Sequence, residues 1–334
     1  MAVLIIAEAG VNHNGDLGIG KRLVEVAATS GADFVKFQTF SADKLVTPKT
    51  KVAEYQNNVF GKENTQLKLL RKLELSENQH FELKRKCLEL NINFMSTAFD
   101  LESADFLKEL GQEIFKIPSG EITNLPLLRH IGKFKKEVIL SSGASNMSEI
   151  SDALEVLISA GTPLNKITVL HCTSAYPANV DEVNLLAMQS ISTEFGVKVG
   201  YSDHTSGIEV AIAAVALGAR IIEKHFTISR DLEGPDHKAS LEPAELKQMV
   251  ESIRNIEKAL GDGIKKPTPG ELENINLIRK SIVAKKNIKK GDLFNQENLT
   301  SKRPSDGISP MQWDQFIGKI ADRDYSPNEM IENG

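Results

Sequence analysis

Short runs rich in Val, Ile and Phe recur along the chain, each as long as a buried strand and each followed by an amphipathic stretch of helical length. Most are separated by roughly 20–30 residues, the length of one strand-plus-helix unit. Eight such units fill the ~250 residues of a (β/α)8 barrel, so the pattern predicts an α/β fold of the TIM-barrel type. The eight expected strands are Val3–Ala9, Phe34–Thr39, Asn93–Phe99, Ile114–Gly120, Val138–Gly143, Ile167–Thr173, Lys198–His204 and Ile221–Phe226.

One connection is longer than the others. Residues 40–92 separate the second and third expected strands and include the polar stretch Tyr55–Asn58 and Gly61. A loop of this length predicts a segment that covers or lines a site. Helix starts are expected at Ser76, at Asn146 with Glu149 three residues later, and near Pro243.

The stretch 261–270 is rich in Gly and Pro and predicts a boundary, because it cannot continue the preceding helix. We therefore expect a barrel over residues 1–262, a linker over 263–276 and a small C-terminal domain over 277–334. In that domain, Ser281–Ala284 and Leu293–Phe294 are expected as short strands between turns, which indicates a mostly β module. Its core is so small that it should dock on its own barrel or on a partner subunit.

Composition excludes several classes of protein. The 334 residues carry 40 Lys and Arg against 45 Asp and Glu, a net charge of −5, which argues against a nucleic-acid partner. Two cysteines, Cys87 and Cys172, are too few for a disulfide framework and fit a reducing, cytoplasmic location. The most apolar stretch, residues 211–219, is about half of the ~20 residues that a membrane helix requires, so no membrane partner is expected.

Polar side chains stand at the ends of the expected strands, where a barrel carries its chemistry. Lys36 and Lys116, with the hydroxyls of Ser119 and Ser141, indicate a site for a phosphate or carboxylate. Two alternatives remain open: each lysine forms a buried ion pair with Glu8 or Glu121, or one lysine forms a Schiff base, as in barrel aldolases.

Two histidines end neighbouring strands. His204 ends the seventh and His225 the eighth, so two imidazoles should lie side by side, near the carboxylates of Asp203, Glu8 and Asp236. This set suits a divalent cation that acts as a Lewis acid, although a histidine at a strand end is also a common structural residue. His13 and His237 are expected as either substrate contacts or turn residues.

Three acids, Glu8, Glu121 and Glu223, come from separate strands, and any of them fits the role of general acid or base. The aromatic residues Phe99 and Tyr176 are expected to pack, or to form a wall against a sugar. Cys172 is expected as a small buried hydrophobe rather than a nucleophile.

Several ordered motifs together resemble the sialic acid synthase family, which makes nonulosonic acids. They span nearly the whole chain and continue into the tail, where Lys302–Pro304 and Gly318–Lys319 resemble the family's antifreeze-like (SAF) domain. The motifs are IAEAGVNHNG at residues 6–15, VKFQ at 35–38, KIPSGE at 116–121, HCTSAYP at 171–177, GYSDHT at 200–205, EKHF at 223–226 and GPDH at 234–237.

The resemblance implies a transferase that condenses phosphoenolpyruvate with an open-chain N-acetylated hexose and releases phosphate, using Mn²⁺, or else Mg²⁺ or Co²⁺. It also implies a domain-swapped homodimer. Its implied site residues are His204 and His225 for the metal; Lys36, Lys116, Ser119 and Ser141, with Ser202 nearby, for phosphoenolpyruvate; Glu8, Glu121 and Lys116 for catalysis; Gln38, Tyr176 and Asp236 for the sugar; Arg303 as a cap over the other subunit's site; and Thr97, Phe99, Ser174 and Glu223 as further substrate contacts.

Within the family, the segments 234–243 and 302–308 are most similar to synthases of N,N′-diacetyllegionaminate, whose sugar substrate is 2,4-diacetamido-2,4,6-trideoxymannose. The alternative product is N-acetylneuraminate, made from N-acetylmannosamine. An alternative of another class is a Schiff-base aldolase or lyase on the same barrel.

Overall fold

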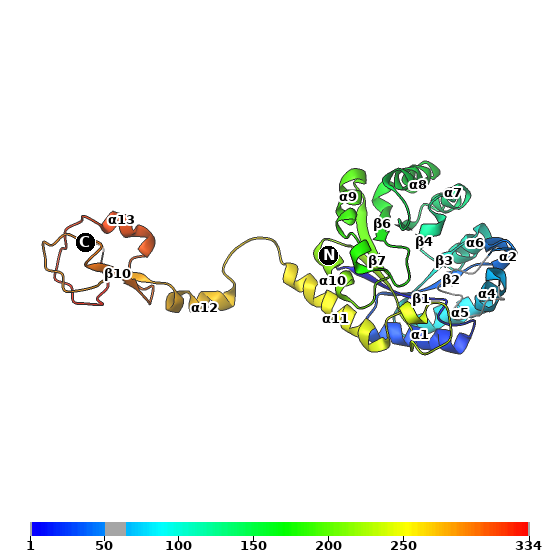
Figure 1. The fold of residues 1–334 in the computed structure, drawn as a ribbon, viewed down its shortest axis with the longest axis horizontal. Coiled ribbons are helices and arrows are strands. Elements are labelled where there is room, and N and C mark those ends of the chain that lie inside the picture. Colours follow the sequence, from blue (N-terminus) through cyan, green and yellow to red (C-terminus); the bar gives the residue numbers. More distant parts are fainter. Residues whose placement is uncertain (1, 51–64, 333–334) are drawn as a thin grey trace. The chain divides into compact units, whose positions relative to one another are not determined.

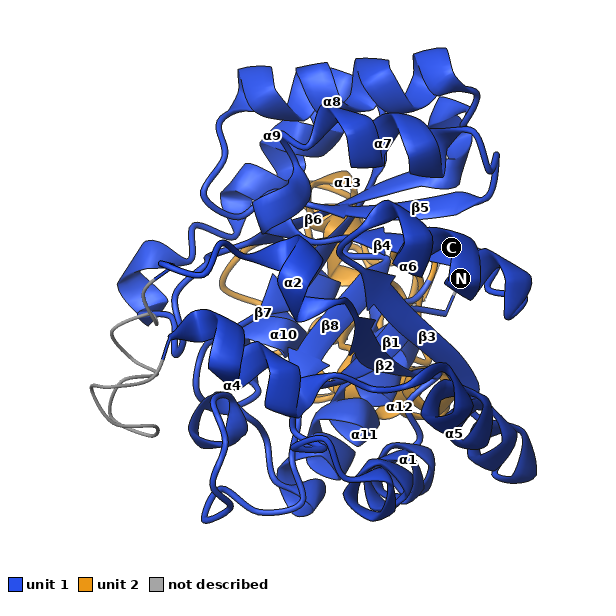
Figure 2. Cartoon of the chain, turned by 90° about the vertical axis from the view of Figure 1, so that its right-hand side faces the viewer, with its two compact units in different colours: residues 1–261 blue, residues 262–334 orange. Residues whose placement is uncertain are grey.

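A computed structural model describes residues 2–50 and 65–332 of the chain. The chain forms two compact units, residues 1–261 and 262–334, which Figure 2 colours separately. The expected loop residues 55–58 and Gly61 lie outside the described part.

Unit 1 is a closed barrel of eight parallel strands in sequential order, enclosed by helices (Figure 1). This confirms the predicted fold class. The strands are β1 (Leu4–Gly10), β2 (Phe34–Thr39), β3 (Asn93–Ala98), β4 (Ile114–Ile117), β5 (Glu137–Ser141), β6 (Ile167–Cys172), β7 (Lys198–Asp203) and β8 (Ile221–His225).

Each strand faces two apolar layers, and for this reason the strands are rich in Val, Ile and Phe. Inside the barrel, Ile6, Met95, Ile139 and Leu170 fill the lower part of the lumen. Outside it, residues such as Phe37 pack against the surrounding helices in a second, larger core. Since the lumen is filled from below, the polar side chains at the carboxyl ends of the strands are left at the barrel mouth.

The surrounding helices begin at the predicted capping residues. Ser76 forms a capping box with Gln79, and Asn146 forms one with Glu149. The last barrel helix begins at Pro243 and ends before Gly261, as expected. The helices are α1 (Leu17–Ser30), α5 (Glu77–Glu89), α6 (Leu101–Glu109), α7 (Leu125–Gly132), α8 (Met147–Ala160), α9 (Leu186–Phe195), α10 (Glu209–Ala216) and α11 (Pro243–Leu260), with short 3₁₀ turns η1 (Ser119–Glu121), η2 (Leu164–Lys166), η3 (Val180–Glu182) and η4 (His237–Ala239).

The long connection between β2 and β3 contributes two more helices, α2 (Ala42–Leu45) and α4 (Gln66–Leu73), which lie side by side (Figure 2). Leu69 and Leu73 of α4 are buried against Val11 and Phe40, which follow β1 and β2. The connection is therefore anchored at the carboxyl end of the barrel.

The fourth strand ends at Ile117 rather than at the expected Gly120, because Pro118 ends the strand and η1 follows. The expected linker 263–276 contains most of a helix that was not predicted, α12 (Pro269–Ile278). Pro269 stands at its first turn, where proline is tolerated, and Thr268 forms a capping box with Glu271.

Unit 2 has a small core built around Ile282, Phe294 and Tyr325. Its sheet pairs β9 (Ser281–Ala284) with β10 (Leu299–Lys302). The strand β9 was predicted, but Leu293–Phe294 forms only an isolated bridge, from Leu293 to Ile320, and β10 was not predicted. A 3₁₀ turn η5 (Pro310–Gln312) and the short helix α13 (Trp313–Phe316) complete the unit.

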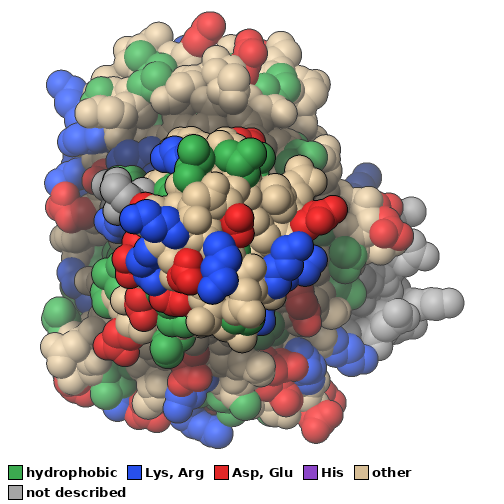
Figure 3. Space-filling view, turned by 90° about the vertical axis from the view of Figure 1, so that its left-hand side faces the viewer, with side chains coloured by type: hydrophobic (Ala, Val, Ile, Leu, Met, Phe, Trp, Pro, Cys, Tyr) green, Lys and Arg blue, Asp and Glu red, His purple; other side chains and the backbone are tan. Residues whose placement is uncertain are grey.

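Among the described helices, none is long and apolar enough to cross a membrane. The face in Figure 3 carries acidic and basic side chains intermixed, without a patch of one sign.

Candidate active site at the barrel mouth

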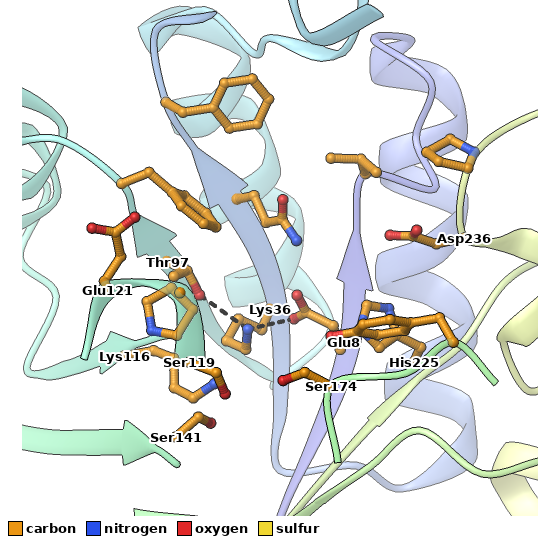
Figure 4. A pocket seen from close by; sticks show the side chains of 18 of the residues that line it. Glu8, Lys36, Thr97, Lys116, Ser119, Glu121, Ser141, Ser174, His225 and Asp236 are labelled. Carbon is orange, nitrogen blue, oxygen red and sulfur yellow. Dashed lines mark hydrogen bonds and ion pairs between the residues drawn. The ribbon is translucent and has the colours of Figure 1, made fainter. Parts of the chain in front are cut away.

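A pocket of about 450 Å³ opens at the carboxyl ends of the strands, within the usual range for small-molecule sites. Every expected site residue except Arg303 lines it, and ten of them are labelled in Figure 4. They are Glu8, Lys36, Gln38, Thr97, Phe99, Lys116, Ser119, Glu121, Ser141, Ser174, Tyr176, Ser202, His204, Glu223, His225 and Asp236.

Four buried side chains of alternating charge form the floor of this pocket. Lys36 Nζ lies 2.8 Å from Glu8 Oε2 and 3.5 Å from Glu223 Oε2. Lys116 Nζ lies 3.0 Å from Glu223 Oε1. The expected alternative of a buried ion pair is thus present for both lysines, although the main acid is Glu223 rather than Glu121.

The two acids of the floor differ in their protonation. Burial raises the pKa of Glu8 to about 7, against the opposing effect of Lys36. Burial also opposes the charge of Glu223, but Lys116 and Lys36 outweigh it and hold the pKa of Glu223 well below its usual range. Near pH 7, Glu8 is therefore close to half protonated, whereas Glu223 is a full carboxylate facing both lysines.

Hydroxyl groups surround the charged floor. Thr97 Oγ1 accepts a hydrogen bond of 3.0 Å from Lys36 Nζ, and Ser202 Oγ donates one of 2.9 Å to Glu223 Oε1. Ser119 Oγ accepts from the Gly143 amide at 2.9 Å. The hydroxyl of Ser141 is buried without a hydrogen-bond partner. A buried donor that lines a pocket and lacks a partner points to a ligand that completes it.

The two histidines lie side by side, as predicted, with ring centroids 5.7 Å apart. The Nδ1 of His204 donates to the carbonyl of Thr173 at 2.7 Å, because a carbonyl can only accept. This bond leaves the Nε2 of His204 with a lone pair. The Nδ1 of His225 is buried without a partner. Burial lowers the pKa of both imidazoles, and the neutral form that results is the one that ligates metals.

These two histidines fit a divalent cation as protein ligands. The carbonyl of Thr173 orients His204 in the way that outer groups orient metal ligands. Over residues 2–50 and 65–332, no cluster of three or more His, Cys, Asp or Glu side chains has the arrangement of a metal site. Water or substrate oxygens would therefore supply the other ligands.

Asp203 lies near His204, as expected, but it does not face the pocket. Strand β7 alternates its side chains, so Ser202 lines the pocket while Asp203 points behind the barrel wall. There the carboxylate pairs with Lys224 at 2.8 Å and accepts from Thr205.

The other polar residues of the pocket have different surroundings. Glu121 lies in η1 and accepts a hydrogen bond from Asn124 Nδ2 at 2.5 Å. Burial raises the pKa of Asp236 to about 6. An ideal Cβ on Gly10, whose φ is +52°, would lie 3.4 Å from atoms of Gln38, Glu8 and His225, so these three side chains converge around the end of β1.

The aromatic residues pack and line the pocket at once. Tyr176 lies over His204, with ring centroids 4.3 Å apart, and meets His225 edge-on. Phe99 packs edge-on against Phe40 at 6.1 Å. Both expectations for these aromatics, packing and a wall against a ligand, are therefore compatible with the structure.

Three residues for which the sequence allowed either a structural or a chemical role are buried. His13 is buried and its Nδ1 accepts from the Gly15 amide. His237 is buried between Thr227 and Asn14. Cys172 is buried, and burial raises the pKa of its thiol, which argues against a nucleophile.

Arg303 belongs to unit 2, where its side chain is exposed and its Nε donates to the carbonyl of Ile278 at 2.9 Å. It follows β10 directly.

Sequence reasoning missed one side of the pocket. Eight apolar side chains line this side of the pocket, and we call this set the apolar wall. They are Val11, Phe40, Leu45, Val46, Leu69, Leu70, Leu73 and Phe99. Of these, Phe99 was expected. The signal for the leucines was the spacing of Leu69, Leu70 and Leu73 along one helix face within the long connection.

Comparison with known proteins accounts for the whole chain. Residues 23–265 match the NeuB family, and residues 279–333 match the SAF domain. The chain is 57% identical to the N,N′-diacetyllegionaminic acid synthase of Campylobacter jejuni, over 98% of each chain. It is 48% identical to the enzyme of the same name from Legionella pneumophila, over 95% of this chain and 90% of the relative.

A solved structure agrees with these relatives. The N-acetylneuraminic acid synthetase of Leptospira borgpetersenii, crystallised with citrate, shares 37% identity and a TM-score of 0.72, over 82% of this chain and 90% of its own. The NeuB match covers well over half of the chain and the SAF match covers most of the remainder. This chain is a member of the NeuB family with a C-terminal SAF domain.

Proposed function

We propose that the chain is a transferase that condenses phosphoenolpyruvate, 2,4-diacetamido-2,4,6-trideoxymannose and water into N,N′-diacetyllegionaminate and phosphate. The observation that carries this proposal is the convergence of two lysines, three glutamates and two histidines on one pocket. The identity of 57% to a synthase of this product supports the choice of sugar, since the sialic acid synthetase of known structure is only 37% identical.

Phosphoenolpyruvate is assigned to the charged floor. Lys36 and Lys116 supply positive charge for its phosphate and carboxylate, and the unpartnered hydroxyl of Ser141 supplies a hydrogen-bond donor. Ser119 and Ser202 extend this donor set. Substrate binding then replaces part of the pairing that the lysines make with Glu8 and Glu223.

The histidines are assigned to a divalent cation, for which we infer Mn²⁺, with Mg²⁺ or Co²⁺ as substitutes. His204 and His225 hold it through ring nitrogens that carry no other hydrogen bond of normal length. When bound, such a cation polarises the sugar aldehyde as a Lewis acid. Gln38, Tyr176 and Asp236 line the space beside the histidines and are assigned to the sugar.

Glu8 is the glutamate best suited to move a proton. In the reaction, C3 of phosphoenolpyruvate forms a bond to C1 of the sugar. Water adds at C2 of phosphoenolpyruvate, and the bond between this C2 and the phosphate oxygen breaks. The water must lose a proton and the new alkoxide must gain one. Glu8 has a pKa of about 7, so its carboxyl accepts or donates a proton readily near neutral pH.

We infer that the active form is a domain-swapped homodimer in which Arg303 of one copy caps the pocket of the other. Arg303 is exposed in the single chain. Helix α12 also exposes three large apolar side chains, Leu272, Leu277 and Ile278, each more than half accessible. Association of two copies would cover them.

The rival function, a Schiff-base aldolase, needs a lysine with a lowered pKa. Burial opposes the charge on Lys36, yet Glu223 and Glu8 outweigh it and raise its pKa. Lys116 Nζ likewise donates a hydrogen bond to a carboxylate, that of Glu223.

The decisive experiment is an assay of phosphate release from phosphoenolpyruvate with Mn²⁺, comparing the diacetamido sugar with N-acetylmannosamine. We expect kcat/KM to favour the diacetamido sugar by about 100-fold, and activity to be lost in EDTA and restored by Mn²⁺. The reverse sugar preference would indicate a sialic acid synthase. Activity that persists in EDTA, with borohydride trapping of pyruvate, would indicate the aldolase.

A further inference from the structure

The pocket has two chemically different sides. Its floor holds the charged groups around Lys36 and Glu223, whereas its other side is the apolar wall contributed mainly by α2, α4 and the segments next to them. Hexoses are polar along their whole length, so a wall of eight apolar side chains does not suit an ordinary sugar. It suits a ligand that has an apolar group at one end.

The apolar wall is a packed surface. Leu69, Leu73, Val11 and Phe40 form a small buried core between α4 and the barrel. Phe99 packs edge-on against Phe40. These contacts hold this part of the wall in position against the barrel.

Within residues 2–50 and 65–332, part of the wall is only half-buried. Leu45, Val46, Leu70 and Phe99 are half-buried and line the pocket. Apolar surface that faces water in a pocket gains free energy when an apolar group covers it. On α4, the polar residue that reaches the pocket is Gln66, one turn before Leu70.

The reaction fixes which end of the sugar lies away from the charged floor. C1 of the sugar must meet C3 of phosphoenolpyruvate, which is assigned to the charged floor. The far end of the open-chain sugar, C6, is therefore directed away from the floor. In 2,4-diacetamido-2,4,6-trideoxymannose C6 is a methyl group, whereas in N-acetylmannosamine it carries a hydroxyl.

We propose that the apolar wall receives the C6 methyl group of the sugar, and that Leu70 and Val46 are specificity-determining residues for 6-deoxy substrates. This inference rests on the proposed function and deepens it. A methyl group would be buried against the wall, whereas a hydroxymethyl group would lose its hydrogen bonds to water there.

The test compares two sugars that differ only at C6, 2,4-diacetamido-2,4,6-trideoxymannose and 2,4-diacetamido-2,4-dideoxymannose. Leu70→Gln and Leu70→Met are a matched pair, because both side chains are unbranched, similar in length and favourable in helices. Only Gln is polar. Val46→Thr replaces one methyl by a hydroxyl at constant shape and serves as a second variant, should Leu70→Gln fail to fold by circular dichroism.

We expect the unmodified protein to favour the 6-deoxy sugar by roughly 10–100-fold in kcat/KM. Leu70→Gln and Val46→Thr should lower kcat/KM for the 6-deoxy sugar by roughly tenfold, mainly through KM, and leave the 6-hydroxy sugar unchanged or improved. Leu70→Met should retain the preference of the unmodified protein.

Two results would overturn the inference: an unmodified protein that uses both sugars equally well, or polar variants that lose the same factor with both. If the unmodified protein releases phosphate in these assays, either result contradicts the inference about the apolar wall and leaves the proposed function intact. If the unmodified protein releases no phosphate with these sugars or with N-acetylmannosamine, the proposed function itself is wrong and the inference fails with it.

Discussion

Lys224 Nζ lies 2.8 Å from Asp203 Oδ2 behind the barrel wall, and both side chains are almost fully inaccessible. The same Nζ donates to the carbonyl of Thr205 at 2.6 Å. Asp203 directly precedes His204, and Lys224 directly precedes His225. The ion pair therefore joins the two strand ends that carry the paired imidazoles.

Replacing Lys224 by Met should lower the free energy of unfolding by about 3–5 kcal/mol, because it leaves the carboxylate of Asp203 buried without its cation. The double variant Asp203→Asn with Lys224→Met should recover part of this loss. Urea unfolding of Lys224→Met, of Asp203→Asn and of the double variant measures these changes. Lys136→Met, in an exposed pair with Glu113, is a control that should change stability by less than about 1 kcal/mol. A double variant as unstable as the sum of both single variants would show that the two charges do not interact.

Ser141→Ala should raise KM for phosphoenolpyruvate roughly 10-fold or more, since it removes an unpartnered donor from the charged floor. Ser142→Ala is the matched control. Its hydroxyl donates to the carbonyl of Leu170 instead. Steady-state kinetics at saturating sugar distinguish the two. Equal effects of both substitutions on KM would contradict the assignment of Ser141 to the phosphoenolpyruvate site.

His225→Ala should abolish metal-dependent turnover and lower Mn²⁺ affinity at least 10-fold while the fold is retained, and His204→Ala should do the same. Calorimetric titration with Mn²⁺ measures affinity independently of activity. His130→Ala is the control, because His130 pairs with Asp105 outside the pocket at 2.8 Å. Full Mn²⁺ affinity in His225→Ala would contradict the metal assignment.

Arg303→Ala should raise KM for the sugar far more than KM for phosphoenolpyruvate, if Arg303 caps the pocket of the partner subunit. Lys302→Ala, which alters the preceding basic residue, should leave both constants nearly unchanged. A parallel rise of both KM values in Arg303→Ala would count against the cap.

Stability should fall as the pH drops from 6.5 to 4, in part because of His13. Burial, with a smaller effect of His80, lowers the pKa of His13 from 6.5 to about 4. In this window the unfolded chain binds a proton that the folded chain does not, so protonation favours unfolding. Between pH 7 and pH 5 this contributes a loss on the order of 2 kcal/mol.

His13→Asn should reduce that pH dependence, because Asn retains an acceptor for the Gly15 amide and does not titrate. Urea unfolding at pH 7 and pH 5 measures the difference. The variant His130→Asn, which replaces a partly buried histidine outside the pocket, is measured alongside for comparison. An unchanged slope in His13→Asn would show that His13 is already charged, or is not buried, at pH 5.

The barrel itself was predictable from the sequence, because each strand lies between two apolar layers and appears as a short apolar run. Local chemistry also determined several helix ends, such as the capping boxes at Ser76 and Asn146. The polar residues at the strand ends were predictable as a group, since a closed parallel barrel brings all carboxyl ends to one rim.

The sequence by itself thus determined the fold class and the polar residues that gather at the barrel mouth. Only the tertiary structure decided which neighbours face the pocket: Glu223 and His225 do, while Lys224 between them pairs with Asp203 outside. A period of two leaves either face possible until the strand is docked. The apolar wall likewise depends on how the long connection that carries α2 and α4 packs onto the barrel. In the sequence, a leucine that lines the pocket cannot be told from a leucine of the core, because only the packing decides which surface it faces.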